Sequence, residues 1–120
     1  MTGGAGFIGH HLCGRLLAEG KQVWMVDRLL PDEGRLRRDR LACHVGHPSF
    51  HFLEQDLSAP AATAALFAEA QPEVVVHLAA AVGVRASLEF PDRYVQDNVA
   101  AFTQILEGCR RQNLRHLIYA

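Results

Sequence analysis

The stretch that decides the fold lies at the start of the chain and reads Gly3-Gly4-Ala5-Gly6-Phe7-Ile8-Gly9. Its glycines are spaced as GxxGxxG, directly before a helical pattern. In turns that bind dinucleotides, the first glycine permits a tight bend, the second lets backbone amides approach a pyrophosphate, and the third lets the helix pack close to the sheet. Glycine turns without such a function are common, so the surrounding sequence has to support this interpretation.

Four apolar runs rich in β-branched residues alternate with helical patterns along the rest of the chain. They predict strands at Gln22–Asp27, Phe50–Asp56, Glu73–Ala80 and His116–Ala120. Their hydrophobicity is continuous rather than alternating, which predicts that both faces are buried.

Helical periodicity predicts three longer helices, at Phe7–Glu19, Ser58–Gln71 and Asp92–Gln112. In the first, Ile8, Leu12 and Leu16 share the face expected to turn inward, and in the second Ser58 is the expected N-cap. Strand, helix and strand repeat with short links. The expected fold class is therefore α/β, a doubly wound parallel sheet.

An acidic residue ends the predicted strand Gln22–Asp27, which is the second strand of the fold if the nearly missing strand before the glycine turn is counted. An acidic side chain at this position binds the adenosine ribose hydroxyls. Asp27 would repel a 2′-phosphate, which favours NAD as the cofactor over NADP. Arg28 keeps NADP open, because an arginine at this position can accept a phosphate; the alternative is a surface charge.

The segment Leu29–Pro48 departs from this regular alternation. It contains Pro31, Gly34 and four arginines, namely Arg35, Arg37, Arg38 and Arg40. We predict loop and one short helix here, with two interpretations of the charge. The arginines form either a basic rim for phosphates or a solvated helix face, and the solvated face is favoured.

Length and composition narrow the possible classes. The 120 residues fit one domain, with 49% hydrophobic residues, 21% charged residues and a formal net charge of -1. Neither a nucleic-acid partner nor a membrane is indicated, and we expect a cytoplasmic protein. The three cysteines, Cys13, Cys43 and Cys109, predict mostly buried thiols rather than disulfides. Cys43, His44, His47 and His51 lack the spacing of a metal site, so no metal is predicted.

Several blocks together resemble one family, the extended short-chain dehydrogenases/reductases that act as NAD-dependent sugar-nucleotide epimerases and dehydratases. The blocks are TGGAGFIG, Asp56-Leu57, Val74–Pro91, Asn98–Arg110 and the final HLIYA, and they match in order and spacing. Within that group, the chain is most similar to the UDP-glucuronate 4-epimerases. The fold this implies is a Rossmann-type NAD-binding domain over residues 1–120.

The resemblance also implies roles for individual residues. The pyrophosphate turn would be formed by Gly3, Gly6, Phe7, Ile8 and Gly9, with Asp27 on the ribose. Asp56 and Leu57 would flank the adenine, and the path to the nicotinamide ribose would be lined by Ala79, Ala80 and Ala81. Asn98 would lie close to the active site, and its place within a helix favours a specific hydrogen bond.

Some of the residues in these blocks also have a structural interpretation without a role in binding. Ala79–Ala81 can instead be small residues at a crowded edge. The resemblance places Arg85 and Ser87 in a loop beside the sugar nucleotide, but Arg85 can equally be a surface residue. His77, inside a predicted strand, is interpreted as a hydrogen-bonded structural residue rather than an acid or base.

In the family, a Tyr-x-x-x-Lys pair handles the hydroxyl proton of the sugar while a 4-keto sugar forms transiently. Here Tyr94 is followed four residues later by Asn98, and Tyr119 by the terminus, so no catalytic residue is assigned. Only Met1-Thr2 precede the glycine turn, which leaves the central strand nearly without residues. We expect a marginally stable fragment, incomplete at both ends, without the substrate domain and inactive alone.

The function expected is the NAD-binding portion of an epimerase that acts on a UDP-sugar, with C4 epimerisation of UDP-glucuronate as the reaction. A related dehydratase or decarboxylase, or an NAD-binding module without catalysis, stays open. The Asp92–Gln112 helix could also form a homodimer interface, which exposure of Phe102 or Leu106 would support.

Overall fold

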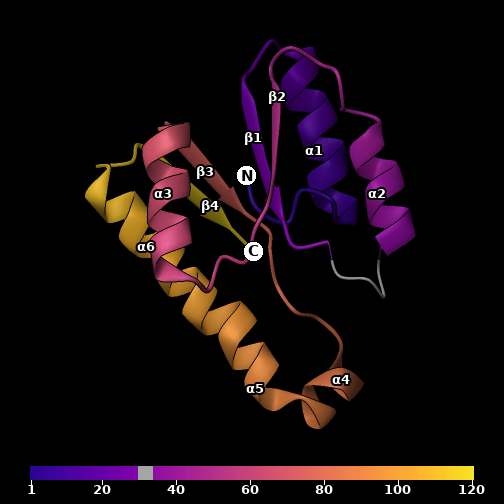
Figure 1. Ribbon diagram of the computed structural model, residues 1–120, viewed down its shortest axis with the longest axis vertical. Coiled ribbons are helices and arrows are strands. Elements are labelled where there is room, and N and C mark those ends of the chain that lie inside the picture. Colours follow the sequence, from indigo (N-terminus) through magenta and orange to yellow (C-terminus); the bar gives the residue numbers. More distant parts are fainter. Residues whose placement is uncertain (30–33) are drawn as a thin grey trace.

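The computed structural model describes residues 1–29 and 34–120, and its strands lie where the apolar runs predict them. They are β1 (Val23–Asp27), β2 (Phe50–Glu54), β3 (Val74–His77) and β4 (His116–Tyr119). β1, β2 and β4 are one or two residues shorter than their apolar runs, and β3 is four residues shorter. β1 pairs with β2 and β3 with β4, both in parallel (Figure 1).

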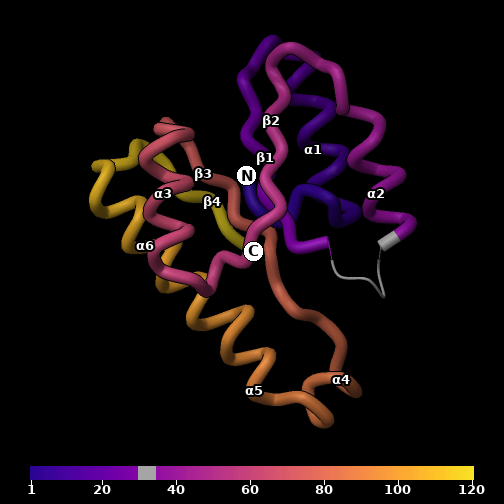
Figure 2. Tube along the Cα trace, viewed as in Figure 1, coloured from indigo at the N-terminus to yellow at the C-terminus, as the bar shows by residue number. Residues whose placement is uncertain are grey.

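Residues 1–3 join the two strand pairs. Thr2 forms parallel bridges to Val26 of β1 and to His77 of β3. Its backbone N–H donates to the Val76 carbonyl at 2.9 Å, while the Gly3 N–H donates to the Val26 carbonyl at 2.9 Å. The chain start accordingly lies between β1 and β3 in the trace (Figure 2). These few residues occupy the place of the central strand and bond both neighbours.

Helices cover both faces of the sheet. One face carries α1 (Phe7–Ala18) and α2 (Gly34–Ala42), and the other carries α3 (Pro60–Ala70) and α6 (Ala101–Arg111). Each face has its own apolar core. The first is built on Cys13, Leu17, Val23 and Met25; the second is built on Val26, Leu57, Leu66, Phe67, Val75, Ala101 and Ile105. The doubly wound α/β class is confirmed.

The inward face of α1 differs from the predicted one. Gly9, Cys13 and Leu17 are buried, whereas Ile8 is 64% exposed. The glycine turn sets this rotation, because a Cβ on Gly9 would stand 2.4 Å from the Gly3 carbonyl oxygen. Only the face that carries Gly9 can therefore approach the turn, and hydrophobic periodicity alone does not reveal that constraint.

Two further expectations are wrong. Ser58 does not cap α3: the N-cap is Ala59, while the Ser58 hydroxyl donates to the Asp56 carboxylate at 2.7 Å. Burial on both faces fails for β2, which is partly buried, and for β4, which is mostly exposed. Within the described residues, each of these strands pairs on one side only and forms a sheet edge.

Residues 82–94, which we call the arm, project from the body below β3 (Figure 1). The arm holds α4 (Val84–Glu89) and α5 (Pro91–Tyr94), and a π-helical segment, η2 (Val95–Ala100), connects it to α6. The predicted long helix is thus continuous over residues 91–111, with a π-helical stretch inside it. It ends before Asn113, which adopts the left-handed conformation as expected (φ 53°). In the described ranges, no helix is long and apolar enough to cross a membrane.

Candidate functional site

The glycine turn is closed by contacts that leave no room for side chains. Gly3 has φ +66°, and a Cβ on it would stand 2.6 Å from the backbone of Leu78 and Ala79. Gly9 is equally crowded, as described above. The turn therefore lies against both the start of α1 and the chain leaving β3, at the carboxyl edge of the sheet.

At Gly6, the second glycine of the GxxGxxG pattern, the turn leads into the start of a helix. Gly6 is the N-cap of α1, and its own N–H donates to the Gly3 carbonyl at 3.1 Å. Among the described residues, no side chain caps this helix, and its first turn contains no acidic residue. The first amides of a helix lack intrahelical acceptors and carry a partial positive charge. Such an end suits an anionic group, for instance a pyrophosphate.

The side chains of Phe7 and Ile8 lie at this helix start and are 67% and 64% exposed. Their backbone amides belong to the uncapped first turn, so whatever binds there would also contact these two apolar groups. The structure therefore brings together all five residues predicted for the pyrophosphate turn.

Asp27 lies directly beneath the turn. Its carboxylate accepts a hydrogen bond from the Ala5 N–H at 2.9 Å and another from the Arg37 guanidinium at 3.1 Å. Burial raises the pKa of Asp27, opposed by the hydrogen bonds from Ala5 and Arg37. With its side chain only 4% exposed, this carboxylate ties β1 to the turn and to α2.

Arg28, next in the chain, turns toward a different set of acids. Its guanidinium contacts the Asp97 carboxylate at 2.6 Å and the Asp56 carboxylate at 3.1 Å. It thus connects the end of β1 with the turn after β2 and with η2. An arginine held by two carboxylates is poorly placed to accept a phosphate, which was the role that kept NADP open.

Asp56 and Leu57 follow β2 and have different environments. Burial opposes ionisation of Asp56, but hydrogen bonds from Ser58 and Arg28 outweigh it and lower the pKa of Asp56. Leu57 belongs to the core against α3, and its carbonyl accepts from the buried Thr63 hydroxyl at 2.9 Å. Only Asp56 presents its side chain at the edge of the sheet.

The four arginines of the basic segment divide into two pairs. Arg35 and Arg38 of α2 are exposed, whereas Arg37 and Arg40 are partly buried toward the turn. Arg40 stands over the Phe7 ring at 5.7 Å, and Arg37 binds Asp27. Arg35 and Arg38 thus form the favoured solvated face, whereas Arg37 and Arg40 are directed toward the glycine turn. The i,i+3 spacing of Arg37 and Arg40 puts them on one face of a helix, and this spacing in the sequence could have separated them from Arg35 and Arg38. Pro31 lies outside the described residues.

The chain leaving β3 is held from two sides. The Ala81 N–H donates to the Asn98 amide oxygen at 2.7 Å, and the Asn98 amide nitrogen donates to the Ala81 carbonyl at 3.0 Å. Asn98 thus makes the specific hydrogen bonds expected of it. On the other side, the Ala79 N–H donates to the Thr2 hydroxyl at 3.3 Å. Ala80, between them, is exposed.

His77 is the structural residue that its strand position predicts. Its Nδ1 is hydrogen-bonded to the Thr2 hydroxyl at 2.7 Å, and its ring stacks on Phe102. Burial lowers the pKa of His77. The neutral ring therefore links β3, the chain start and α6.

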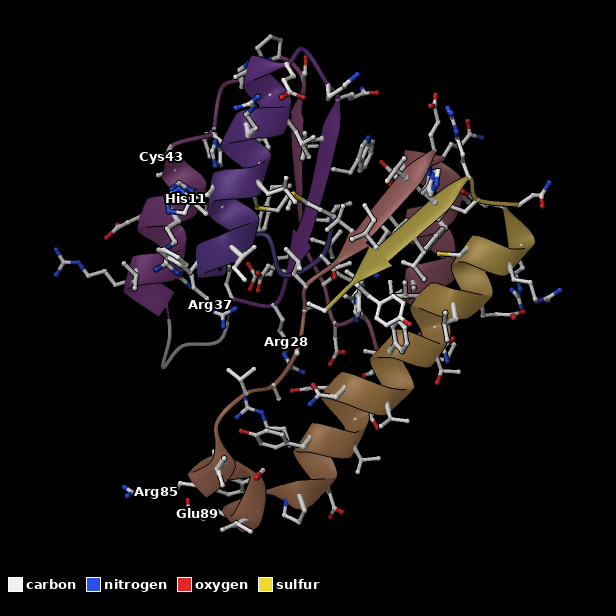
Figure 3. All side chains as sticks on the ribbon, turned by 180° about the vertical axis from the view of Figure 1, so that it is seen from behind. His11, Arg28, Arg37, Cys43, Arg85 and Glu89 are labelled. Carbon is white, nitrogen blue, oxygen red and sulfur yellow. The ribbon has the colours of Figure 1, made fainter. Side chains whose placement is uncertain are left out.

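Arg85 and Ser87 are not brought to the turn. Both lie on α4 rather than in a loop; the Ser87 hydroxyl donates to the Val84 carbonyl at 2.7 Å, and Arg85 is exposed. Figure 3 shows Arg85 at the tip of the arm, away from Arg28 and Arg37. The segment forms the short helix α4, which carries Arg85 away from the glycine turn. Closeness in sequence to the end of β3 therefore does not place these residues near the turn.

The cysteines and histidines of the basic segment are dispersed. His44 is buried and hydrogen-bonded to His10 of α1, while His51 stacks on Trp24. Cys43 is exposed, contrary to expectation, since it lies on the outer side of the α2 end. Within residues 1–29 and 34–120, no three acidic, histidine or cysteine side chains gather as a metal ion would require.

Comparisons with known proteins agree over the whole chain. Residues 1–120 match the NAD dependent epimerase/dehydratase family. Protein CapI of Staphylococcus aureus is 41% identical over 121 residues, and a probable UDP-glucuronate 4-epimerase of Rhizobium meliloti is 37% identical over 121 residues. Each alignment covers 100% of this chain and 36% of the relative.

A solved structure, the UDP-glucose 4-epimerase of Thermus thermophilus in complex with NAD, superposes with a TM-score of 0.81 at 33% identity. The superposition covers 97% of this chain and 34% of that protein. The chain thus spans about a third of the length of the proteins it matches.

Proposed function

Because the chain belongs to the NAD-dependent epimerase/dehydratase family, we propose that residues 1–120 form the NAD-binding domain of a sugar-nucleotide epimerase. The whole enzyme would act on a UDP-sugar, with UDP-glucuronate as the substrate and C4 as the epimerised carbon. Support for that substrate comes from the resemblance to UDP-glucuronate 4-epimerases and from the 37% identity to the probable member of that group.

One observation carries the proposal: the glycine turn, the uncapped start of α1 and Asp27 converge at the carboxyl edge of a parallel sheet. Ligands of open α/β sheets bind at this edge. The Ala5 N–H binds the Asp27 carboxylate, so the anion-binding end and the ribose-binding acid are linked by a 2.9 Å hydrogen bond. This arrangement fits the pyrophosphate and the adenosine ribose of a dinucleotide.

In the proposed complex, the amides of Phe7 and Ile8 bind the pyrophosphate, and Gly3, Gly6 and Gly9 keep the turn closed. Asp27 accepts from the ribose hydroxyls, and Asp56 flanks the adenine. The backbone of Ala79–Ala81, held by Asn98 and Thr2, borders the nicotinamide ribose. NAD, when bound, would accept a hydride from the sugar and return it; the chain's own contribution is position and orientation.

Residues 1–120 contain no tyrosine followed four positions later by lysine. We therefore assign proton transfer to residues of the whole enzyme outside this segment, and we expect the purified 120-residue chain to bind NAD without turning over any UDP-sugar. A dehydratase or decarboxylase would use the same dinucleotide site, because such relatives differ in the part that binds the sugar.

The proposed assembly is a homodimer through the outer face of η2 and α6. Val95, Val99 and Leu106 share one helical stripe there and are 58%, 60% and 45% exposed. Phe102, in the same stripe, instead packs on His77 and Tyr119. A second copy of the stripe is the partner that would cover it. Light scattering of Val99→Lys should show a monomer where the wild type is dimeric.

Calorimetric titration of the chain with NAD tests the cofactor proposal. Asp27→Asn should weaken NAD binding at least tenfold, because an amide is a poorer acceptor for the ribose hydroxyls. Asp39→Asn, on the exposed side of α2, is the matched control and should leave binding unchanged. Absence of NAD binding at millimolar concentration would contradict the proposal.

The substrate is tested on the longest native polypeptide that contains these residues, incubated with UDP-glucuronate. An epimerase gives the C4 epimer with all atoms retained. A decarboxylase releases carbon dioxide, whereas a dehydratase of another nucleotide sugar leaves UDP-glucuronate unchanged. Chromatography with mass detection separates the three outcomes.

A further inference from the structure

Two histidines far apart in the sequence are hydrogen-bonded to each other between α1 and α2, which lie side by side (Figure 1). His10 Nδ1, on α1, lies 3.1 Å from His44 Nε2, in the turn that follows α2. His44 is only 8% exposed, and its ring packs against Phe50 of β2. On the α1 side, Gly14 leaves room for this ring, since a Cβ there would stand 3.4 Å from it. The ring of His44 is thus enclosed by both neighbouring elements.

This contact anchors residues 41–49, which we call the α2 end segment and which join α2 to β2. Its one buried residue is His44. Leu41 is partly buried against the core beneath α1, and the start of α2 is anchored separately, by Arg37 on Asp27. A segment with so little apolar burial can open locally, without unfolding of the whole chain. Loss of the histidine contact should therefore release this segment first.

The hydrogen bond limits how many protons the two rings can carry. An imidazole nitrogen accepts a hydrogen bond only while it carries no hydrogen, and in a protonated ring both nitrogens are donors. The contact between His10 and His44 therefore tolerates one added proton and excludes two. In water, each ring takes up its proton at about pH 6.5. Acidification below that pH thus favours the doubly protonated form, which the closed contact excludes.

The charges around His10 oppose protonation as well. Burial lowers the pKa of His10, and the charges of His44, His11 and Arg40 lower it further, against a hydrogen bond with the Arg40 backbone. His11 follows on α1, with its ring centroid 5.0 Å from that of His10, and Arg40 comes from α2. All three charged neighbours are therefore cationic when protonated.

The surroundings of His44 supply no compensating negative charge. Phe50 faces it from β2, and the other titratable groups of its own segment, Cys43 and His47, are exposed. Among the described residues, no ion pair includes either ring of the His10–His44 contact. A second proton on the closed pair is therefore neither hydrogen-bonded across the contact nor neutralised.

We propose that His10 and His44 form an acid-sensitive latch: their shared hydrogen bond holds the α2 end segment on α1 at neutral pH, and protonation of both rings releases it. The closed pair holds at most one added proton and the open pair holds two, so opening in acid takes up at least one proton. The stabilisation by the pair is accordingly complete above about pH 6.5 and is lost as the pH falls below it. The latch works without a dinucleotide, so it does not depend on the proposed function.

Hydrogen–deuterium exchange of the longest native polypeptide that contains residues 1–120 tests the latch, without ligand and corrected for the intrinsic pH dependence of exchange. The amides of His44 and His47 donate to the carbonyls of Leu41 and His44, so they report opening of the α2 end segment. Because one proton is taken up, the opening constant should rise about tenfold for each pH unit below about 6.5.

His10→Gln should remove this dependence. The glutamine amide oxygen accepts a hydrogen bond from His44 whether that ring is neutral or protonated, so closing no longer excludes a proton. The rise should shrink to less than about twofold for each pH unit. His116→Gln is the control, because it removes an exposed histidine at the start of β4, in the other strand pair. It should keep the rise of the wild type.

Two results would overturn the inference. One is a wild-type opening constant that changes less than about twofold between about pH 6.5 and 5.5, a measurement that needs no variant. The other is a rise of wild-type size in a His10→Gln chain that circular dichroism shows to be folded. If that variant does not fold, nitrogen NMR of the wild-type imidazoles decides instead. Two protonated rings in a segment that still resists exchange contradict the latch, and protonation that coincides with loss of protection supports it.

Discussion

The glycine turn and the arm both follow a strand of the same sheet, yet they are held in opposite ways. Gly3, Gly4 and Ala5 are buried, and the turn is fixed by backbone contacts at Gly3 and by the side chains of Met25 and Asp27. In the arm, Val84 and Leu88 are each 80% exposed, and α4 and α5 contain no buried residue. Internal packing therefore determines the turn, while a few polar bonds determine the arm.

Those polar bonds lie at the base of the arm. The Tyr94 hydroxyl donates to the carbonyls of Val82 and Gly83 at 2.7 and 2.8 Å, and Asn98 holds Ala81. Below β1, Arg28 connects Asp56 with Asp97. A segment held this way gains little from hydrophobic burial. Mutations in the arm should therefore lower the free energy of unfolding less than mutations in the turn, and through lost hydrogen bonds rather than lost packing.

The largest effect should follow from Gly3→Val. The side chain would meet the backbone of Leu78 and Ala79 and would force a β-branched residue to adopt φ +66°, so we expect a loss of roughly 3 kcal/mol or more in the free energy of unfolding. Dinucleotide binding should be lost as well. Urea denaturation measures the first effect and calorimetry the second.

Gly20→Ala is the control for Gly3→Val. Gly20 also has a positive φ, +74°, but no described atom lies within 4 Å of its Cβ position. It should cost only about 1 kcal/mol, from the backbone conformation alone. Equal losses at both glycines would show that crowding at the turn contributes nothing.

A smaller effect is expected at the base of the arm, from Asn98→Leu. Both amide atoms bond the backbone of Ala81, so the substitution leaves a partly buried N–H and C=O without their side-chain bonds. We expect a loss of about 1 to 3 kcal/mol. Thr103→Val, which removes an exposed hydroxyl on the same long helix, should cost less than half as much.

These two regions also show how far the sequence predicts structure. The glycine spacing, the position of Asp27 and the apolar runs are local signals, and the turn, the strands and the double layer of helices follow from them. The predicted inward face of α1 was wrong, because the close contact of Gly9 with Gly3 is a tertiary contact that overrides the apolar stripe. The roles of Thr2 and Asp97 depend on contacts across the sheet, which no spacing reveals.

The arm was predicted less well for a related reason. Residues 84–89 contain no strong local signal that distinguishes a helix from a loop, so Arg85 and Ser87 were predicted to lie in a loop. Similarly, the four arginines gave one undivided basic segment, although only Arg37 and Arg40 face the turn. Side-chain charge is visible in a sequence, but the direction in which a short helix presents it depends on how that helix packs.

A third prediction concerns the neutral histidine that links the turn to β3. Burial lowers the pKa of His77 from its usual 6.5, so the folded chain binds fewer protons than the unfolded chain below that pH. Its contribution to stability should be complete above about pH 6.5 and lost as the pH falls through the lowered value. His77→Gln should flatten the dependence of the urea midpoint on pH between about 7 and 5.

The smallest effect should come from the arm itself, from Leu88→Ser. Because Leu88 is 80% exposed, removing its side chain should change the free energy of unfolding by less than about 0.5 kcal/mol. Leu66→Ala, at a site 7% exposed in the core, should cost about 2 to 5 kcal/mol. Urea denaturation of both variants makes the comparison direct. A loss at Leu88 close to that at Leu66 would mean that the arm packs against an apolar surface in solution, and its exposed residues would then belong to an interface rather than to solvent.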